Sequence, residues 1–518
     1  MLFNSYQFIL VFLPITFLVF YALGKVQKYQ LAMLWLVVAS LFFYSWWAYK
    51  FLFLLLFSIT ANYFIGTRII AKLSEHPKVS KSWLIGGIVF NLSLLIFYKY
   101  TNFLIDSVNV AFAKQFTHLD IVLPLAISFF TFQQIAFLVD LYQGKAKIPP
   151  LLTYFLFNTF FPQLIAGPIV HHQEMIPQLD NKRVLIFRPK NISIGLTIFI
   201  IGLFKKVGIA DNLAPIADQV FKLAAMGEIP TFWEGWTGAL CYSFQLYFDF
   251  SGYSDMAIGL AKLFGINLPI NFNSPYKAAN IIDFWRRWHI TLSRFLRDYL
   301  YIPLGGNKHG TFNRYKNLML TMLLGGLWHG AGLNFILWGA LHGAYLIVNH
   351  LWQQIYKNSK LNFSHLLSYR YACHVLTFLS VVFAWVLFRA ENFESAMRMY
   401  QAMSGSAGIQ LPARLTVYLE QFSLSSLFIA NGMFHHLLFQ WQEALLMLTA
   451  AVIVCFSFPN TIAFMNNYYP IKQEYFGNQR TLSVAFKPTV LWALFLSLLA
   501  FICLTLLSHP SEFLYYKF

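Results

Sequence analysis

Long apolar stretches separated by short polar connections recur along almost the whole chain. A helix that crosses a lipid bilayer needs about 20 predominantly apolar residues. The pattern therefore predicts an all-α polytopic membrane protein with roughly ten to twelve tilted transmembrane or re-entrant helices. The expected spans are residues 7–24, 31–47, 52–71, 83–98, 122–142, 148–166, 192–210, 234–250, 333–352, 371–389, 437–458 and 487–508.

The spans belong to a single membrane domain, residues 1–518, because no polar linker is long enough to separate two soluble domains. Three parts of this domain differ in polarity. We interpret 1–150 as a scaffold of apolar helices and 151–352 as the part that carries the reactive groups. The remaining part, 353–518, contains a polar connection, an amphipathic stretch and closing helices.

The middle part is unusual because glycine, proline and charged residues interrupt its apolar runs. The interruptions are Pro162–Pro168, Asp249–Asp255 and Gly325–Gly332. Non-helical backbone at membrane depth is tolerated only where it is buried in protein or lines a water-filled cavity. Repeated interruptions in one region therefore predict a solvated chamber or funnel.

Composition favours a membrane protein over the alternative of a large soluble helical protein. Hydrophobic residues make up 58% of the chain and charged residues only 11%, whereas soluble proteins carry about 25% charged residues. The net charge of +17 falls in short loops, where basic residues mark the cytoplasmic side and meet anionic lipid head groups. We therefore expect the lipid bilayer, and no nucleic acid, as a partner. The basic residues that agree with one orientation, with Met1 outside, are Lys25, Lys28, Arg68, Lys72, Lys78, Lys81, Lys145 and Lys147.

Residues 280–300 have the spacing of one helix with an apolar aromatic side. The pairs Asp283–Arg287 and Arg294–Asp298 are four residues apart and can form ion pairs on that helix. The polar stripe could face the chamber and hold an anionic, phosphate-bearing donor, or it could lie among lipid head groups as part of an interfacial helix. This stripe consists of Arg286, His289, Ser293 and Arg297.

His329 lies in an apolar segment between Gly325 and Gly326 on one side and Gly330 and Gly332 on the other. Glycine permits positive φ and close backbone approach, so we expect the helix to break here. An ionisable residue inside a membrane is by default a candidate functional residue. Imidazole exchanges a proton near neutral pH, and acyl transfer to a hydroxyl needs such a base. The alternative is a structural histidine bonded to a backbone carbonyl.

The next predicted helix carries a stripe of polar and aromatic residues. Its members Asn334 and His342 could line the same chamber and contact substrate, or they could bond to neighbouring helices across packed interfaces. The stripe consists of Asn334, Trp338, His342, Tyr345 and Asn349.

Motifs of several other enzyme classes are missing from the sequence. There is no His-Glu-x-x-His, no Gly-x-x-x-x-Gly-Lys-Ser/Thr and no Gly-x-Ser-x-Gly, which argues against zinc proteases, P-loop ATPases and serine hydrolases. The adjacent pairs His171–His172 and His435–His436 project in different directions, so we expect no metal at either pair alone, and we expect no bound cofactor. We interpret the four cysteines as small buried hydrophobic residues; they are Cys241, Cys373, Cys455 and Cys503.

Five motifs resemble those of the membrane-bound O-acyltransferase (MBOAT) family, and within it the bacterial alginate O-acetylase branch. They appear in the order expected for that family, and the chain length and flanking spans match it as well. The motifs are Phe161–Ile169 (FPQLIAGPI), Tyr247–Gly259 (YFDFSGYSDMAIG), Asn271–Tyr276 (NFNSPY), Phe284–Gly306 (beginning FWRRWHITLS) and Leu324–Gly332 (LGGLWHGAG).

The resemblance implies a ring of tilted helices around a central, water-reaching funnel. It places the family's intramembrane catalytic histidine on His329, as the base, and its second motif histidine on His289, as a helper on the cytoplasmic side. The family also includes a teichoic acid D-alanyl transferase. The stretch Tyr299–Gly306 and the long C-terminal third are closer to the polysaccharide O-acetylases, so the resemblance favours acetyl over D-alanyl transfer.

We therefore expect an O-acyltransferase in the bacterial inner membrane that takes an acetyl group from a cytoplasmic thioester. The expected donor substrate is acetyl-CoA, with Arg286 and Arg287 near its phosphates. The expected acceptor is a hydroxyl of an extracytoplasmic polysaccharide, such as alginate, or of a periplasmic acetyltransferase-like partner. Ser293, Asn334 and His342 are further candidate substrate contacts.

Two alternative functions remain open at this point. A transporter could move the acyl donor or the polymer without chemistry, but many transporters carry paired broken segments in two halves, and no such pairing is seen. A membrane glycosyltransferase is the other alternative, and the sequence has no carboxylate cluster for a metal and a sugar nucleotide.

Overall fold

The structure, a computed structural model, is helical almost throughout. It describes residues 1–308, 310–358, 366–410, 428–429, 433–434, 441–468, 485–507 and 513–514. Two two-residue strands, β1 (Ile409–Gln410) and β2 (Phe428–Ile429), pair in parallel. The fold is therefore the all-α membrane architecture that the sequence predicts.

The helices follow one another with few long connections. The α-helices are α1 (Leu13–Lys25), α2 (Tyr29–Ala48), α3 (Leu52–Leu73), α4 (Pro77–Leu95), α5 (Thr101–Phe112), α6 (Ile127–Tyr142), α7 (Leu151–Thr159), α8 (Phe161–Leu164), α9 (His172–Leu179), α10 (Pro189–Phe204), α11 (Asp211–Ala225), α12 (Phe232–Leu263), α13 (Ile281–Arg287), α14 (Ile290–Leu296), α15 (Gly310–His329), α16 (Leu333–Asn358), α17 (Leu367–Arg389), α18 (Phe393–Ser404), α20 (Trp441–Ser457), α21 (Thr461–Phe464) and α22 (Val490–Leu506). Short 3₁₀ segments are η2 (Tyr49–Phe51), η4 (Lys182–Leu185) and η6 (Pro275–Lys277), and π-helical segments are η1 (Gln7–Phe12), η3 (Ile96–Tyr100), η5 (Lys205–Ala210) and η7 (Arg297–Tyr301).

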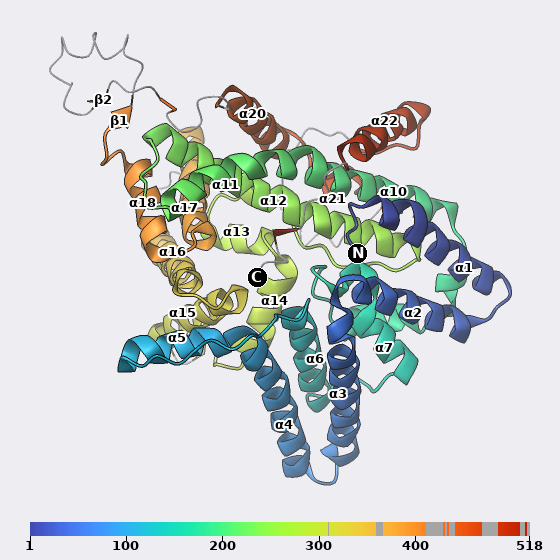
Figure 1. Cartoon of the computed structure of the whole chain (residues 1–518). Coiled ribbons are helices and arrows are strands. Elements are labelled where there is room, and N and C mark those ends of the chain that lie inside the picture. Colours follow the sequence, from blue (N-terminus) through green and yellow to red (C-terminus); the bar gives the residue numbers. More distant parts are fainter. Residues whose placement is uncertain are drawn as a thin grey trace.

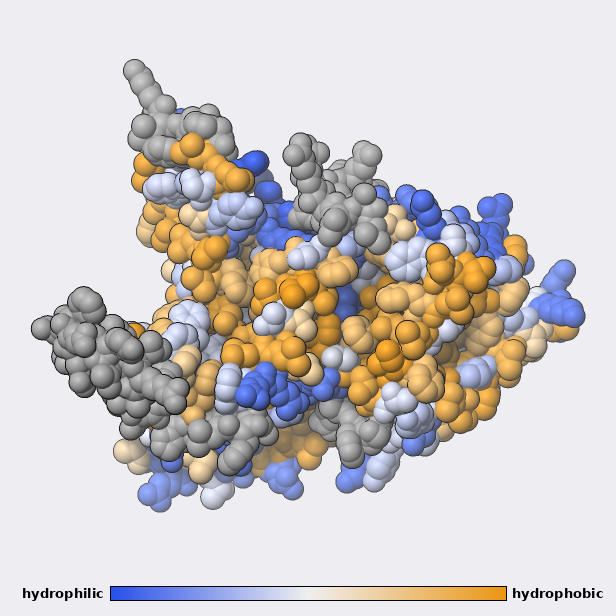
Figure 2. Space-filling view, turned by 90° about the horizontal axis from the view of Figure 1, so that it is seen from above, coloured by the Kyte–Doolittle hydropathy of each residue, from blue (hydrophilic) through white to orange (hydrophobic). Residues whose placement is uncertain are grey.

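One face of the molecule carries a broad apolar band. Figure 2 shows hydrophobic residues in a broad band between hydrophilic residues above and below. In the view of Figure 1 the long helices surround the short helices α13 and α14. Within the described residues, the helical stretches long and apolar enough to cross a membrane are Gln7–Lys25, Tyr29–Leu73, Pro77–Phe112, Pro189–Ala225 and Leu367–Arg389, and shorter apolar helices are α6, α20 and α22.

Some expected spans are interrupted. The span expected at 148–166 is divided between α7 and α8, because the chain turns at Phe160 with Pro162 beginning the next helix. The span expected at 122–142 becomes helical only at Ile127, after Ala126 in the left-handed region at φ 64°. The first residues of the span expected at 437–458 lie outside the described part of the chain.

Helices α10 and α12 pack unusually closely. A Cβ added to Gly195 or Gly202 would come within 2.7 Å of a carbonyl oxygen of α12, that of Gly259 or Gly252. Only glycine permits this approach. The two helices therefore form a tight pair that anchors the centre of the fold.

The interruption expected at Asp249–Asp255 is not observed, because α12 runs unbroken through it. Both aspartates are buried in the helix and paired with lysines of η5. Lys206 Nζ lies 2.6 Å from Asp249 Oδ1, and Lys205 Nζ lies 2.6 Å from Asp255 Oδ2. Opposite charges brought together in this way make buried carboxylates compatible with a continuous helix. The predicted interruption was wrong because it rested on residue type alone, and the lysines that neutralise these aspartates lie in another segment.

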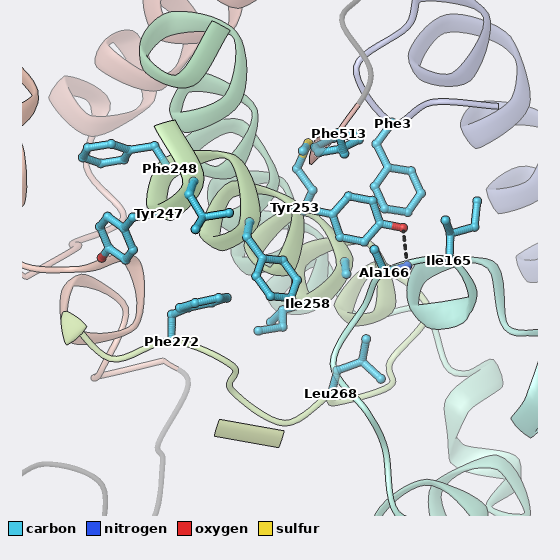
Figure 3. Packing of buried hydrophobic residues seen from close by; sticks show 14 of the residues in the cluster. Phe3, Ile165, Ala166, Tyr247, Phe248, Tyr253, Ile258, Leu268, Phe272 and Phe513 are labelled. Carbon is cyan, nitrogen blue, oxygen red and sulfur yellow. Dashed lines mark hydrogen bonds between the residues drawn. The ribbon is translucent and has the colours of Figure 1, made fainter. Parts of the chain in front are cut away.

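Tyr253 of α12 joins distant parts of the chain in the core (Figure 3). Its hydroxyl accepts a hydrogen bond from the backbone N–H of Ala166 at 3.4 Å. Its ring lies 4.9 Å from the ring of Phe3 and 4.7 Å from that of Phe513. The motif around Tyr253 thus serves the packing of the scaffold.

Candidate active site

His329 is the last residue of α15, and the chain reverses over three residues before α16 begins at Leu333. The helix was expected to break at Gly325–Gly332; it breaks only after His329. Gly326 stays helical, and α16 approaches it so closely that an added Cβ would come within 2.2 Å of the Phe335 oxygen. A Cβ added to Gly339 of α16 would likewise come within 2.3 Å of the Met322 oxygen of α15. The glycines thus bring the two helices together and place His329 at their junction.

The imidazole of His329 is buried, with 4% of the residue exposed. Aromatic rings surround it. Its centroid lies 4.9 Å from that of Trp328, 5.2 Å from that of Trp338 and 5.2 Å from that of Phe388. Such an apolar enclosure excludes water, and groups placed in it act on one another more strongly than in water.

His289 occupies a sharp turn in the centre of the fold. It is fully buried and adopts the left-handed conformation at φ 41°, which is uncommon for residues other than glycine. Its Nδ1 lies 3.0 Å from Oδ1 of Asn271, and that oxygen also accepts from the Thr291 hydroxyl at 2.9 Å. Trp328 lies between the two histidines, 6.4 Å from His289 and 4.9 Å from His329 by ring centroids. The structure therefore brings both predicted histidines to one central region.

The single helix expected over 280–300 is wrong. The chain forms α13, an extended residue at Trp288, the left-handed His289, then α14 and η7. His289 consequently leaves the predicted stripe and turns toward Asn271. The hydrogen bonds of Ile290 N and His289 Nδ1 to Asn271 hold this turn, and no local pattern in the sequence predicts so distant a partner.

One of the two predicted ion pairs is present. Arg287 Nε lies 2.8 Å from Asp283 Oδ1. The predicted pair Arg294–Asp298 is not formed, because Arg294 makes two bonds to Glu174 of α9, at 2.7 and 2.8 Å. Asp298 is bonded to its neighbour Arg297 instead. The π-helical turn of η7 changes the i,i+4 geometry on which the prediction depended.

A cavity of about 640 Å³ opens beside α14 and is rich in arginine. We call it the arginine cavity. It brings together the remaining residues of the predicted stripe, which supports the view that the stripe faces a chamber. Arg286 is exposed, and it lacks an ion-pair partner among the described residues. The lining includes Arg286, Arg287, Ser293, Arg294, Arg297 and His350.

A second cavity, of about 380 Å³, lies next to the turn after His329. We call it the lysine cavity, because Lys99 of η3 lines it together with Tyr98, Asn102, Gly330 and Phe335. Phe335 and His350 are 15 residues apart on α16, so the two cavities are separated by about 22 Å along this helix.

An aromatic wall, formed by Trp285, Trp338 and His342, connects the two cavities through the core. Trp285 lines the arginine cavity, and its ring lies 5.2 Å from His342 and 5.9 Å from Trp338. Trp338 lies 5.2 Å from His329, which adjoins Gly330 of the lysine cavity. The indole N–H groups of Trp285 and Trp338 and both ring nitrogens of His342 have no hydrogen-bond partner in the described residues. Buried groups of this kind normally have partners, so these are candidates to bond with substrate or water.

The other predicted contacts occupy different surroundings. Asn334 donates to the Ala390 carbonyl at 2.9 Å and joins α16 to the end of α17, and it lines neither cavity. The Ser293 hydroxyl donates to the Trp288 carbonyl at 3.3 Å while lining the arginine cavity.

The histidine pairs are likewise separate from this site. His171 Nδ1 lies 3.1 Å from the Tyr299 hydroxyl, and His172 Nδ1 lies 3.2 Å from Asp140. Burial lowers the pKa of both imidazoles, and the nearby carboxylates of Asp140 and Glu174 act in the opposite direction. The pair His435–His436 lies outside the described residues. The part of the chain that the structure describes contains no metal-binding cluster of histidine, cysteine, aspartate or glutamate.

The sequence prediction missed Lys99, which the structure places against the catalytic candidate. Its Nζ lies 2.6 Å from the Trp328 oxygen and 3.2 Å from the His329 oxygen. A single lysine at the end of the apolar run 83–98 was the available signal, because a charged residue at the edge of a membrane span needs a partner. Its partners, more than two hundred residues further along the chain, gave no local pattern.

Comparisons with known proteins identify the family of this chain. The family model of MBOAT, the membrane-bound O-acyltransferase family, matches residues 140–389. A peptidoglycan O-acetyltransferase from Helicobacter pylori is 47% identical over 437 residues, which are 79% of this chain and 81% of that protein. A probable alginate O-acetylase from Pseudomonas aeruginosa is 43% identical, over 78% of this chain and 75% of that protein. A teichoic acid D-alanyltransferase from Streptococcus thermophilus is 29% identical, over 44% of this chain and 57% of that protein.

Proposed function

Because this chain belongs to the membrane-bound O-acyltransferase family, we propose that it carries an acetyl group from a cytoplasmic thioester to a hydroxyl on the opposite side of the membrane. It is a multi-pass membrane O-acyltransferase. The observation that carries the proposal is the position of His329, at the junction of α15 and α16 and between two cavities that lie toward opposite ends of α16.

The two cavities face opposite sides in this proposal. Glu174, which binds Arg294 of the arginine cavity, adjoins Gln173, and Gln173 donates to the Lys145 carbonyl at 3.0 Å. Basic loops such as the one at Lys145 mark the cytoplasmic side. The lysine cavity lies at the end of η3. Helix α4, which leads there, begins beside the basic residue Lys78, and α4 with η3 is long enough to span about 36 Å.

The arginine cavity fits the phosphate-bearing end of an acyl thioester such as acetyl-CoA. Guanidinium groups bind phosphate oxygens in a planar, bidentate manner. Arg286 is the best placed of them, because Arg287, Arg294 and Arg297 already contact carboxylates. The unpartnered groups of the aromatic wall then meet the polar arm of the donor on its way to His329, with His342 as the contact that the sequence predicts.

His329 acts as the general base in this proposal. It takes the proton of the acceptor hydroxyl as the oxygen attacks the thioester carbonyl carbon. The tetrahedral intermediate breaks its carbon–sulfur bond, and the departing thiolate takes the proton from the imidazolium. The ester and the free thiol are the products, and His329 returns to its neutral form. His289, held by Asn271, supports the donor side of the reaction.

The acceptor is a polysaccharide hydroxyl or a hydroxyl of an extracytoplasmic partner protein. The similarity to a peptidoglycan O-acetyltransferase and to an alginate O-acetylase supports acetyl as the group and a cell-surface glycan as its destination. The corresponding location is the bacterial inner membrane, where a cytoplasmic thioester and a periplasmic glycan are accessible from opposite faces.

The test is to replace His329 with alanine and measure O-acetyl esters on isolated peptidoglycan and on exopolysaccharide. A general base contributes about 100- to 10,000-fold to a rate, so the ester content should fall to background on one polymer. The amount of that polymer should stay constant, and the variant should accumulate in the membrane. A His118→Gln variant is the matched control, since His118 is exposed and, among the described residues, pairs with Asp106 alone.

Retention of the ester in His329→Ala would contradict the role of the base. Loss of the polymer itself, with the ester density of the remainder unchanged, would favour transport without chemistry. Purified full-length protein in lipid nanodiscs, supplied with acetyl-CoA and with either mannuronate oligomers or soluble peptidoglycan fragments, then identifies donor and acceptor by release of free CoA.

A further inference from the structure

We infer that Lys99 is a positioning residue that holds the catalytic histidine in place through the backbone of the last turn of α15. The inference rests on the proposed role of His329 as the base. Lys99 Nζ donates to the carbonyl oxygens of Trp328 at 2.6 Å and His329 at 3.2 Å. The hydroxyl of the adjacent Tyr100 donates to the Leu327 oxygen at 2.8 Å. Two neighbouring side chains of η3 therefore bind three consecutive carbonyls.

These carbonyls need partners because they end a helix. The last four carbonyls of an α-helix lack hydrogen bonds within it, and they form the negative end of the helix dipole. Here the chain turns away immediately after His329, so no further helical turn can supply donors. A carbonyl without a hydrogen-bond partner is costly in an apolar interior. An ammonium group at this position satisfies both the hydrogen bonds and the dipole.

The way in which Lys99 is bound distinguishes it from the lysines that pair with α12. Lys205 and Lys206 each lie 2.6 Å from an aspartate. Within the described residues Lys99 has no carboxylate partner, and its third contact is the Ser128 hydroxyl at 3.4 Å. Its three N–H bonds thus match three acceptors, two of which belong to the turn of His329. Placing a lysine inside a membrane protein costs free energy, so a lysine at this position points to a specific role.

The same lysine lines the lysine cavity together with Gly330 and Phe335. It therefore lies between the cavity and the turn that ends in His329. Because its hydrogen-bonding capacity is used by the protein, its contribution is to fix the backbone that carries the imidazole. A displacement of about 1 Å at a reacting centre can cost 100-fold in rate, so loss of this contact should slow the chemical step.

The test uses the nanodisc assay with acetyl-CoA and the acceptor identified there, on three variants. Lys99→Met removes all three donors while keeping the length of the side chain, and its kcat should fall about 10- to 100-fold with the KM for acetyl-CoA changed less than about twofold. Lys99→Arg retains charge and donors and should recover activity to within about fivefold of the parent. Tyr100→Phe removes one neutral bond and should cost about threefold. Lys50→Met, which changes an exposed lysine on η2, should have no effect.

A purely structural lysine would reduce the amount of folded protein and leave the kcat of the folded fraction unchanged, which would overturn the inference. It would also fail if Lys99→Met kept full turnover, or if the KM for the acceptor rose in proportion to the loss, because the lysine would then bind substrate. If Lys99→Met does not accumulate, the Lys99→Arg variant provides the test. Arginine keeps the charge and the donors, so a Lys99→Arg protein that accumulates fully but has its kcat reduced more than about 50-fold would overturn the inference. An active His329→Ala variant would contradict the proposed function separately, whatever Lys99→Met shows.

Discussion

Two helix pairs in this molecule use the same packing device and treat buried polar groups in opposite ways. Helix α10 meets α12, and α15 meets α16, through glycines that let one backbone touch the other. On η5 and α12 each buried lysine is matched with an aspartate. Beside α15, Lys99 has only carbonyl and hydroxyl partners, and the aromatic wall holds ring nitrogens without partners in the described residues.

The comparison teaches how to separate scaffold from site in a membrane interior. Charged groups that are all paired within the protein contribute to the fold, and they have no free donor or acceptor with which to bind a ligand. A group that finds no partner in the protein is costly there, and its retention points to a substrate. Substitutions at the α10–α12 pair should therefore change how much protein accumulates in the membrane, and substitutions at the α15–α16 pair should change the turnover rate.

The largest effect is expected from Asp249→Ala, which leaves Lys206 buried beside one fewer carboxylate. Removing one partner of a buried pair costs about 3–5 kcal/mol. We expect little protein in the membrane, measured by immunoblot. The control is the triple variant Lys206→Met, Asp249→Leu, Asp211→Asn, because Asp211 Oδ1 lies 2.9 Å from Lys206 Nζ and would otherwise lose its partner. This variant should recover accumulation, and failure of the recovery would mean that these residues do more than neutralise one another.

A smaller effect is expected when α15 and α16 are forced apart. Gly326→Leu places a side chain where a Cβ alone would come within 2.2 Å of a carbonyl, and overpacking of this kind costs about 1–3 kcal/mol. Both the melting temperature and acetyl transfer should fall, since His329 lies at the same junction. Gly332→Ala should be tolerated, because the nearest heavy atom to its Cβ would be 3.5 Å away. Equal damage from both variants would refute the role of close approach.

His342→Phe should separate activity from stability. It keeps an aromatic ring in the aromatic wall and removes two nitrogens that have no protein partner among the described residues. If they bond to the donor, turnover with acetyl-CoA should fall up to about 10-fold, since a neutral hydrogen bond contributes about 1 kcal/mol. The melting temperature should stay the same or rise. A stability loss with unchanged kinetics would assign His342 to packing.

The smallest effect is expected from Arg286→Gln in the arginine cavity. Its side chain is exposed, so a contact with a donor phosphate is screened by salt. The KM for acetyl-CoA should rise about threefold at low ionic strength, and the difference should shrink as salt is added. Arg183→Gln, at an exposed position of η4, is the control. No change in KM at low salt would exclude Arg286 from the donor site.

The sequence predicted the architecture well because the bilayer imposes a strict rule on apolar length. It also predicted that Arg286, Ser293 and Arg297 would share a surface, and all three line the arginine cavity. It could not predict the turn at His289, because the partner that holds it, Asn271, acts through tertiary contacts. The helical spacing in 280–300 correctly indicated helical structure there, but it could not reveal the turn that divides the segment.

Charges were the main source of error. The aspartates of α12 suggested a broken helix, whereas Lys205 and Lys206 allow it to continue. Arg294 was assigned to Asp298 and binds Glu174 instead. Each correction involves a partner remote in the sequence, and a single sequence carries no direct signal for such pairs. The roles of His329 and His342 in the reaction are predictions that the experiments above test, and those of His289 and Asn334 stay predictions.

The π-helical segment η3 suggests how Lys99 came to lie against the turn that ends in His329. A π turn holds one residue more per hydrogen-bonded ring than an α turn, so gaining a single residue within an α-helix is enough to produce it. Deleting one residue of Ile96–Tyr100 would return the segment to α-helical geometry and change the direction in which Lys99 projects, withdrawing it from the turn that it binds. The placement of this lysine could therefore be acquired, or lost, in one genetic step.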